Sequence, residues 1–120
     1  MIFIGNDIVK VSRIDHLFKR YGSHFLDRNF SQNEMKIVNM KRHKTIHLSG
    51  KFSAKEASRK ALLSAGIGDS IYFRDIQILN RENGAPYIKI DKIDMNIIKN
   101  FQISISHTNS YATAFALLEL

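Results

Sequence analysis

The segment from Thr45 to Ala65 constrains the fold more than any other part of the chain. It contains no proline, is rich in Ala, Leu and Lys, and stops at Gly66-Ile-Gly68, a pattern that predicts one long helix. Small residues recur along it at helical spacing, at Gly50, Ala54, Ala57 and Ala61. Because a stripe without bulky side chains lets a helix approach a sheet closely, we expect this helix to lie at the centre of the fold.

Other segments have the composition and alternation of strands and shorter helices. Strands are predicted at 2–9, 71–79, 86–90, 101–107 and 111–118. Asn83-Gly84 predicts a hairpin between the second and third of them. Helices are predicted at 12–26, where Gly22 could kink or end the helix, at 31–41, and at 91–100. The Ser-x-x-acid capping pattern opens the first two, at Ser12-x-x-Asp15 and Ser31-x-x-Glu34.

A chain of 120 residues has the length of one domain. We therefore expect a single α+β domain over residues 1–120, with a small, largely antiparallel sheet of three to five strands and the long central helix packed across it. The last two strands are expected to pair antiparallel.

The charge balance points to a negatively charged partner. The chain has 18 Lys plus Arg against 11 Asp plus Glu, which suits nucleic acid, anionic lipid, a phosphate-rich cofactor or an acidic protein. The absence of cysteine excludes a disulfide scaffold, a thiolate zinc site and a thiol nucleophile. No apolar run of about 18 residues could span a bilayer, and residues 1–7 lack the features of a signal peptide. We expect a cytoplasmic protein without a membrane partner.

Two carboxylates could form a cation site although they are distant in sequence. Asp7 lies near the end of the first predicted strand and Glu56 lies on the long helix, and a helix packed on a sheet can bring such positions together. Two hard carboxylates with phosphate oxygens and water suit Mg²⁺. A purely structural interpretation stays open, because Glu56 and Lys60 also have the i, i+4 spacing of an exposed helical ion pair.

Two further groups of residues have both structural and functional readings. His107 lies among hydroxyl side chains at a strand end, where it could be structural or could reach a ligand phosphate. A row of basic residues follows one face of the first helix, at Arg13, His16, Arg20 and His24. This row is either a solvated face or a docking surface for an acidic partner.

Separated motifs, in order along the whole chain, resemble one family in combination. They are Gly5-Asn-Asp7-Ile-Val9 with Arg13-Ile14, Gly50-Lys-Phe-Ser-Ala-Lys55-Glu56-Ala with Lys60-Ala-Leu, Asn83-Gly-Ala-Pro86-Tyr87, and Ser104-Ile-Ser-His107-Thr108 with Tyr111-Ala112. The combination resembles the holo-[acyl-carrier-protein] synthases, the small bacterial 4′-phosphopantetheinyl transferases. The resemblance implies that family's fold and Mg-dependent transfer of phosphopantetheine from coenzyme A to a serine of apo acyl carrier protein, in support of fatty acid biosynthesis. It also implies a homotrimer with active sites between subunits.

The resemblance assigns roles position by position. Asp7 and Glu56 fall on the magnesium-binding acids, and Lys60 on a lysine near the pyrophosphate. Lys51, His107 and Thr108 would contact coenzyme A phosphates, although Lys51 replaces the arginine of most relatives and so lacks the bidentate fork. The region that holds the acidic carrier protein corresponds to Arg13, Leu17, Arg20 and Arg28.

The last predicted strand has two apolar faces. One carries Tyr111, Thr113, Phe115 and Leu117, and the other carries Ala112, Ala114, Ala116 and Leu118. One monomer's helices can cover only one face, so the second is a candidate subunit contact, where alanines would permit close approach about a threefold axis. If this face forms the subunit contact, Ala114→Arg should give a protein that is monomeric or aggregated and that has lost transfer activity.

Two functions of other classes remain as alternatives. A basic nucleic-acid-binding domain would explain the charge, but no KH-type clamp, RNP-type aromatic run or zinc motif is present. A metal-dependent phosphohydrolase would share the carboxylate pair and would release phosphate without an acceptor protein.

Overall fold

The computed structural model describes residues 1–120 as an α+β fold in which one helix dominates. Its strands are β1 (Ile2–Lys10), β2 (Ile76–Asn80), β3 (Pro86–Ile90), β4 (Asn100–His107) and β5 (Tyr111–Glu119). Its helices are α1 (Val11–Tyr21), α2 (Ser23–Asn29), α3 (Gln32–Asn39) and α4 (Lys44–Ser64), with short 3₁₀ turns at Phe73–Asp75 and Met95–Ile97. No helix is both long and apolar enough to cross a bilayer.

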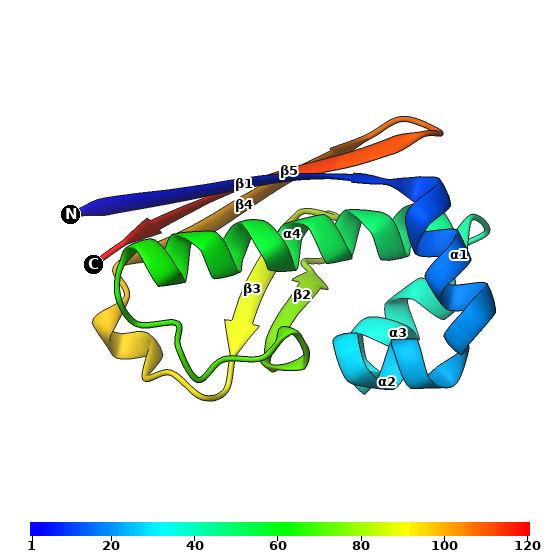
Figure 1. Ribbon diagram of the computed structural model, residues 1–120. Helices are drawn as coiled ribbons and strands as arrows, with labels where there is room; N and C mark the ends of the chain where they lie inside the picture. Colours follow the sequence, from blue (N-terminus) through cyan, green and yellow to red (C-terminus); the bar gives the residue numbers. More distant parts are fainter.

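The strands form two antiparallel sheets, where one sheet was expected. One has the order β1-β5-β4 and the other is the β2-β3 hairpin. The long helix α4 runs beneath the three-stranded sheet, with the hairpin on its other side and α1, α2 and α3 gathered at one end (Figure 1). The central position predicted for this helix is confirmed.

Small residues allow the tight contact between α4 and the three-stranded sheet. Ala54, Ala57 and Ala61 are buried in the same cluster as Ala114 and Ala116 of β5. A Cβ atom at Gly5 would lie 2.0 Å from the backbone oxygen of Ala57. No side chain fits there, so a glycine in β1 is required where the strand crosses α4.

The alanine face of β5 is therefore part of the monomer's own core, and the expectation that it forms a subunit contact is wrong. Ala112, Ala114 and Ala116 are buried, whereas Tyr111 and Phe115 on the opposite face are 44% and 45% exposed. The covering helix is α4, whose small residues match those of the strand. An arginine at Ala114 would disrupt this core and would not report on assembly.

Two predicted helices differ in the structure. The helix expected at 12–26 is divided by Gly22, whose φ of 53° ends α1 and begins α2. The helix expected at 91–100 is only the turn Met95–Ile97. The sheet takes over the end of that segment, because the Lys99 amide donates to Glu119 and β4 begins at Asn100.

The capping predictions had different outcomes. At α3, the Ser31 hydroxyl accepts from the Glu34 amide and the Glu34 carboxylate accepts from the Ser31 amide, so the capping box is confirmed. At α1, the helix begins at Val11 without a side-chain cap. Asp15 instead lies 2.8 Å from the Lys19 ammonium, and this contact holds the pKa of Asp15 below its ordinary value.

The strand expected at 71–79 begins later, at Ile76. The 3₁₀ turn before it directs the carbonyls of Phe73 and Ile76 to the ammonium group of Lys55. Residues 73–75 form this turn and do not extend the strand.

Candidate functional site

The β1 strand brings Asp7 against the exposed side of α4. The Ser53 hydroxyl donates to the backbone oxygen of Asp7 at 3.1 Å. The Lys60 ammonium donates to the backbone oxygen of Asn6 at 3.0 Å and lies 3.4 Å from Oδ1 of Asp7. Two turns of the helix thus contact the end of the Gly5-Asn6-Asp7 segment.

Glu56 lies on the same face of α4 as these contacts. It follows Ser53 by three residues and precedes Lys60 by four, and residues at these spacings are neighbours on a helix surface. Its side chain is half-buried. The ion-pair partner of Lys60 is Asp7 and not Glu56, so the simple i, i+4 surface pair is not what the structure contains.

The donor set at this crossing suits Mg²⁺. Asp7 and Glu56 supply two hard carboxylates, and nowhere does the chain gather three or more His, Cys, Asp or Glu side chains into a metal-binding group. Mg²⁺ keeps several waters and combines one or two carboxylates with substrate phosphates instead of an all-protein cage. The residues present therefore fit this ion.

A second part of the site is a basic cavity of about 200 Å³ between α4, β4 and the β2-β3 hairpin. Lys51 and His107, both assigned by the resemblance to coenzyme A, line it, together with Asn80 and Gly84. Lys51 and Lys60 are nine residues apart on α4, which is about 13 Å of helix. Nine residues are about two and a half helical turns, so the two lysines point to opposite sides of α4: Lys51 contacts the hairpin and Lys60 contacts β1.

Lys51 is more buried than a lysine that binds phosphate at an exposed surface would be. Only 6% of the residue is exposed, and its ammonium donates to the Ile78 carbonyl and to Oδ1 of Asn80. Burial lowers the pKa of Lys51 to about 8, against the opposing influence of Glu34. The lysine is still mostly charged at pH 7.

Thr108 lies next to this cavity without lining it. Its hydroxyl accepts from the amides of Ser110 and Tyr111 at 3.1 and 3.0 Å. The side chain is exposed and shapes the turn between β4 and β5. In this structure it positions the end of the strand that carries His107.

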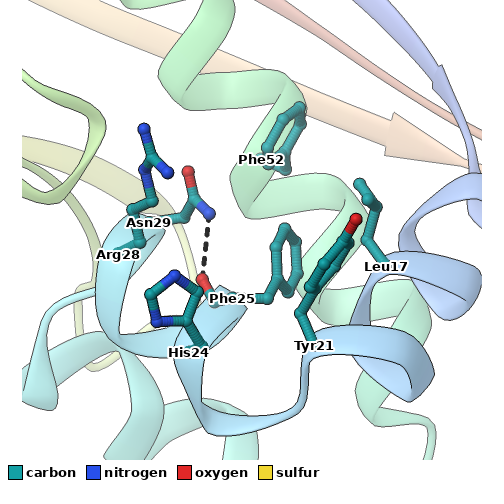
Figure 2. A pocket seen from close by; sticks show the side chains of 7 residues that line it. All are labelled: Leu17, Tyr21, His24, Phe25, Arg28, Asn29 and Phe52. Atoms are coloured by element: carbon teal, nitrogen blue, oxygen red, sulfur yellow. Dashed lines mark hydrogen bonds between the residues drawn. The ribbon is translucent and has the colours of Figure 1, made fainter.

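The residues expected to hold a carrier protein lie on α1 and α2. Arg13, Arg20 and Arg28 are exposed. Leu17 and Arg28 line a cavity of about 400 Å³, in which Tyr21, Phe25 and Phe52 form an apolar side while His24, Arg28 and Asn29 form a polar side (Figure 2). The break at Gly22 turns α2 so that Arg28 faces the same cavity as Leu17.

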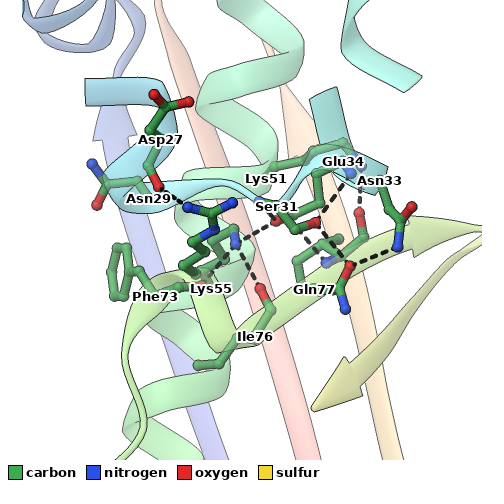
Figure 3. Close-up of polar contacts among 12 residues, drawn as sticks. Asp27, Asn29, Ser31, Asn33, Glu34, Lys51, Lys55, Phe73, Ile76 and Gln77 are labelled. Atoms are coloured by element: carbon green, nitrogen blue, oxygen red, sulfur yellow. Dashed lines mark hydrogen bonds and ion pairs between the residues drawn. The ribbon is translucent and has the colours of Figure 1, made fainter. Parts of the chain in front are cut away.

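Sequence reasoning missed a buried ion pair, because Glu34 was interpreted only as part of a capping box. Its carboxylate lies 2.6 Å from the Lys55 ammonium, and both side chains are fully buried. Glu34 also accepts from the Ile78 amide at 3.0 Å, and Figure 3 shows α3, α4 and β2 converging on this pair. The available signal was that Lys55 lies beside the small-residue stripe of the long helix.

His47 was also missed as a cavity residue. It lines the same cavity as Lys51 and His107. The signal was its position four residues before Lys51 on the long helix, on the same helix face.

Comparisons with known proteins agree with these features. The sequence profile of the 4′-phosphopantetheinyl transferase superfamily matches residues 3–116. The holo-[acyl-carrier-protein] synthase of Protochlamydia amoebophila is 42% identical over 95% of this chain and 94% of its own length. That of Sulfurimonas denitrificans is 41% identical over 97% of this chain and 93% of its own length.

Solved structures agree equally well. The Helicobacter pylori holo-[acyl-carrier-protein] synthase in complex with coenzyme A has a TM-score of 0.84, with 36% identity over 97% of this chain and 99% of that one. The Neisseria meningitidis enzyme has a TM-score of 0.87 with 29% identity, and both chains are fully covered. The chain therefore belongs to the 4′-phosphopantetheinyl transferase superfamily and, within it, to the holo-[acyl-carrier-protein] synthases.

Proposed function

We propose that this protein transfers the 4′-phosphopantetheine group of coenzyme A to a serine of an apo acyl carrier protein, and that Asp7, Glu56 and Lys60 carry the reaction. The products are holo acyl carrier protein and adenosine 3′,5′-bisphosphate, and the carrier then serves fatty acid biosynthesis. The observation that carries the proposal is the crossing of β1 and α4, where Lys60 contacts Asp7 on the helix face that also bears Glu56. The relatives support the choice of reaction.

The roles at the crossing follow from where charge develops. The serine oxygen attacks the β-phosphorus of coenzyme A as its hydroxyl proton passes to water or to a nearby carboxylate. The bond from phosphorus to the bridging oxygen breaks, so negative charge grows on the leaving phosphate. Lys60, whose side chain is 48% exposed, can turn from Asp7 toward that charge and stabilise it. Asp7 and Glu56 would hold Mg²⁺, whose charge offsets that of the pyrophosphate when it is bound.

The basic cavity is proposed to hold the phosphates at the nucleotide end of coenzyme A. Lys51 supplies a positive charge there, and His107 lies at the opposite wall on β4. Lysine offers a single charged group, whereas arginine could bind a phosphate through two parallel N–H groups. The hydrogen bonds of Lys51 to Asn80 and to the Ile78 carbonyl therefore orient its ammonium group. Thr108 is proposed to contribute through the end of β4.

The carrier protein is proposed to dock on α1 and α2. Arg13, Arg20 and Arg28 offer exposed positive charge to an acidic helix. The cavity beside Leu17 has an apolar side that could accept an apolar side chain of that helix. This combination of a charged rim and an apolar centre is typical of protein interfaces.

The outer face of the three-stranded sheet is proposed to pack against two further copies of the chain. Ile4 and Ile8 of β1 are 58% and 67% exposed, and Phe115 of β5 lies beside them. A contiguous apolar surface of this kind marks an interaction site. The proposed assembly is a homotrimer with active sites between subunits.

A cytoplasmic location remains a prediction.

An intact-mass assay tests the proposed reaction. The protein is incubated with coenzyme A, Mg²⁺ and an apo acyl carrier protein, and we expect the carrier to gain the mass of one phosphopantetheine. Phosphate release without a carrier adduct would instead support a phosphohydrolase. A carrier that stays unmodified, with nucleic acid co-purifying with the protein, would favour the nucleic-acid-binding alternative.

A further inference from the structure

The basic cavity contains only positive or positively ionisable side chains among its titratable residues. Lys41 comes from the segment before α4, His47 and Lys51 from α4, and His107 from β4. The remaining lining residues are apolar or neutral. A cavity lined by these groups and without a carboxylate favours an anionic ligand.

The two histidines approach each other across this cavity. The ring centroids of His47 and His107 are 6.3 Å apart, with an angle of 67° between the ring planes. Lys51 lies one turn after His47 on the same face of α4. A phosphate group in the cavity would therefore lie within reach of both rings and of the lysine.

The surroundings of His47 favour its neutral form when the cavity has no anion. Burial lowers the pKa of His47 below 6.5, and the positive charges of Lys41, His107, Lys51 and His43 lower it further. These are the charged and titratable groups that face the ring from the preceding segment, from α4 and from β4. A bound phosphate reverses the sign of the local charge, so the protonated imidazole becomes the favoured form.

We infer that His47 is a further binding residue for the phosphate-bearing end of coenzyme A, and that its imidazole takes up a proton when the phosphate enters the cavity. This inference rests on the proposed function, because it assumes that coenzyme A is the ligand of the cavity. Proton uptake linked to binding means that the affinity for coenzyme A rises as the pH falls toward 6. The contribution disappears when His47 is replaced.

Calorimetry measures this linkage directly. The full-length protein is titrated with coenzyme A at pH 7 in two buffers that differ in ionisation enthalpy, which gives the number of protons bound per ligand. Wild type is compared with His47→Asn and with the control His16→Asn, a change at an exposed histidine of α1 outside the cavity. Any proton exchanged by the phosphate of the ligand is common to all three proteins and cancels in the differences.

We expect wild type and His16→Asn to take up about 0.3 to 0.7 proton more than His47→Asn. Equal uptake in all three proteins, with coenzyme A bound by each, would overturn the role of His47 and leave the proposed transfer reaction intact. Failure of the wild type to bind coenzyme A would overturn both.

A second measurement does not depend on the variant folding. The pKa of His47 is followed by NMR titration of the imidazole signals in the wild type, without and with saturating coenzyme A. We expect the pKa to rise on binding. A pKa of His47 that coenzyme A leaves unchanged would refute the inference.

Discussion

The contact between Lys60 and Asp7 is the most informative one at the level of single residues. Lys60 stays 48% exposed while its ammonium group lies against one backbone carbonyl and one carboxylate. An ion pair this exposed contributes little to stability. Its position beside Glu56 on α4 therefore makes sense as a charge available for substrate.

Replacing Lys60 tests that role. Lys60→Met should leave the thermal midpoint nearly unchanged and should lower kcat about tenfold to a hundredfold, because about 1.4 to 2.7 kcal/mol of transition-state stabilisation is lost. Transfer kinetics and thermal unfolding of the same preparation check both parts. Lys36→Met, at an exposed lysine of α3, is the control, and an equal loss in both variants would argue against the assignment.

The buried Glu34–Lys55 pair operates at the level of elements, because it joins α3, α4 and β2. Glu34 receives hydrogen bonds from the Ser31 and Ile78 amides as well as from Lys55. Lys55 also donates to the carbonyls of Phe73 and Ile76. These contacts tie α4, which also carries Glu56, to α3 and to the start of β2.

Removing one charge of the Glu34–Lys55 pair should lower the free energy of unfolding more than removing both charges. Glu34→Gln leaves a buried ammonium without its counter-charge, so we expect a loss of about 3 kcal/mol or more in the free energy of unfolding. Combining Glu34→Gln with Lys55→Met removes both charges and should recover part of this loss. Urea denaturation of the single and double variants is the measurement, and a single variant as stable as wild type would contradict the account.

A charge reversal on α1 should affect the apparent KM for only one of the two substrates. Arg20→Glu reverses a charge that we propose faces an acidic carrier, so the apparent KM for the carrier should rise about tenfold while that for coenzyme A stays nearly constant. Added salt should weaken carrier binding by the wild type in the same way. An equal effect on both substrates would place Arg20 in a structural role or in the active site.

For the whole molecule, the outer face of the three-stranded sheet is the surface through which we propose that three copies of the chain assemble. Phe115→Arg should shift the protein from trimer to monomer in analytical ultracentrifugation and should reduce transfer, because the apolar contact receives a charge. Leu63→Arg is a matched control, since Leu63 is 44% exposed and Phe115 is 45% exposed. A monomeric wild type with full activity at assay concentration would refute the assembly and the shared site.

Local patterns predicted much of this fold. The long helix, the hairpin at Asn83-Gly84 and the antiparallel pairing of 101–107 with 111–118 are confirmed, because each depends on propensity or turn chemistry within a short segment. The division into two sheets could not be predicted in this way. It depends on α4 lying between them, which is a property of packing.

The site shows the same division between local and tertiary information. The family resemblance assigned Asp7, Glu56 and Lys60 to one group, and the structure places Asp7 and Lys60 in contact. The deep burial of Lys51 and the pairing of Glu34 with Lys55 depend on how three elements meet. Which face of β5 is covered was likewise decided by α4, since both faces of that strand are apolar.

The most direct test of the central claim is the kcat for phosphopantetheine transfer by Glu56→Gln at saturating coenzyme A and Mg²⁺. This change keeps the shape of the side chain and removes one of the two carboxylates at the β1–α4 crossing. The account predicts a fall of at least about a hundredfold, or ~3 kcal/mol of transition-state stabilisation, while the control Glu82→Gln in the exposed β2-β3 turn keeps wild-type turnover. Near-normal transfer by a folded Glu56→Gln would contradict it.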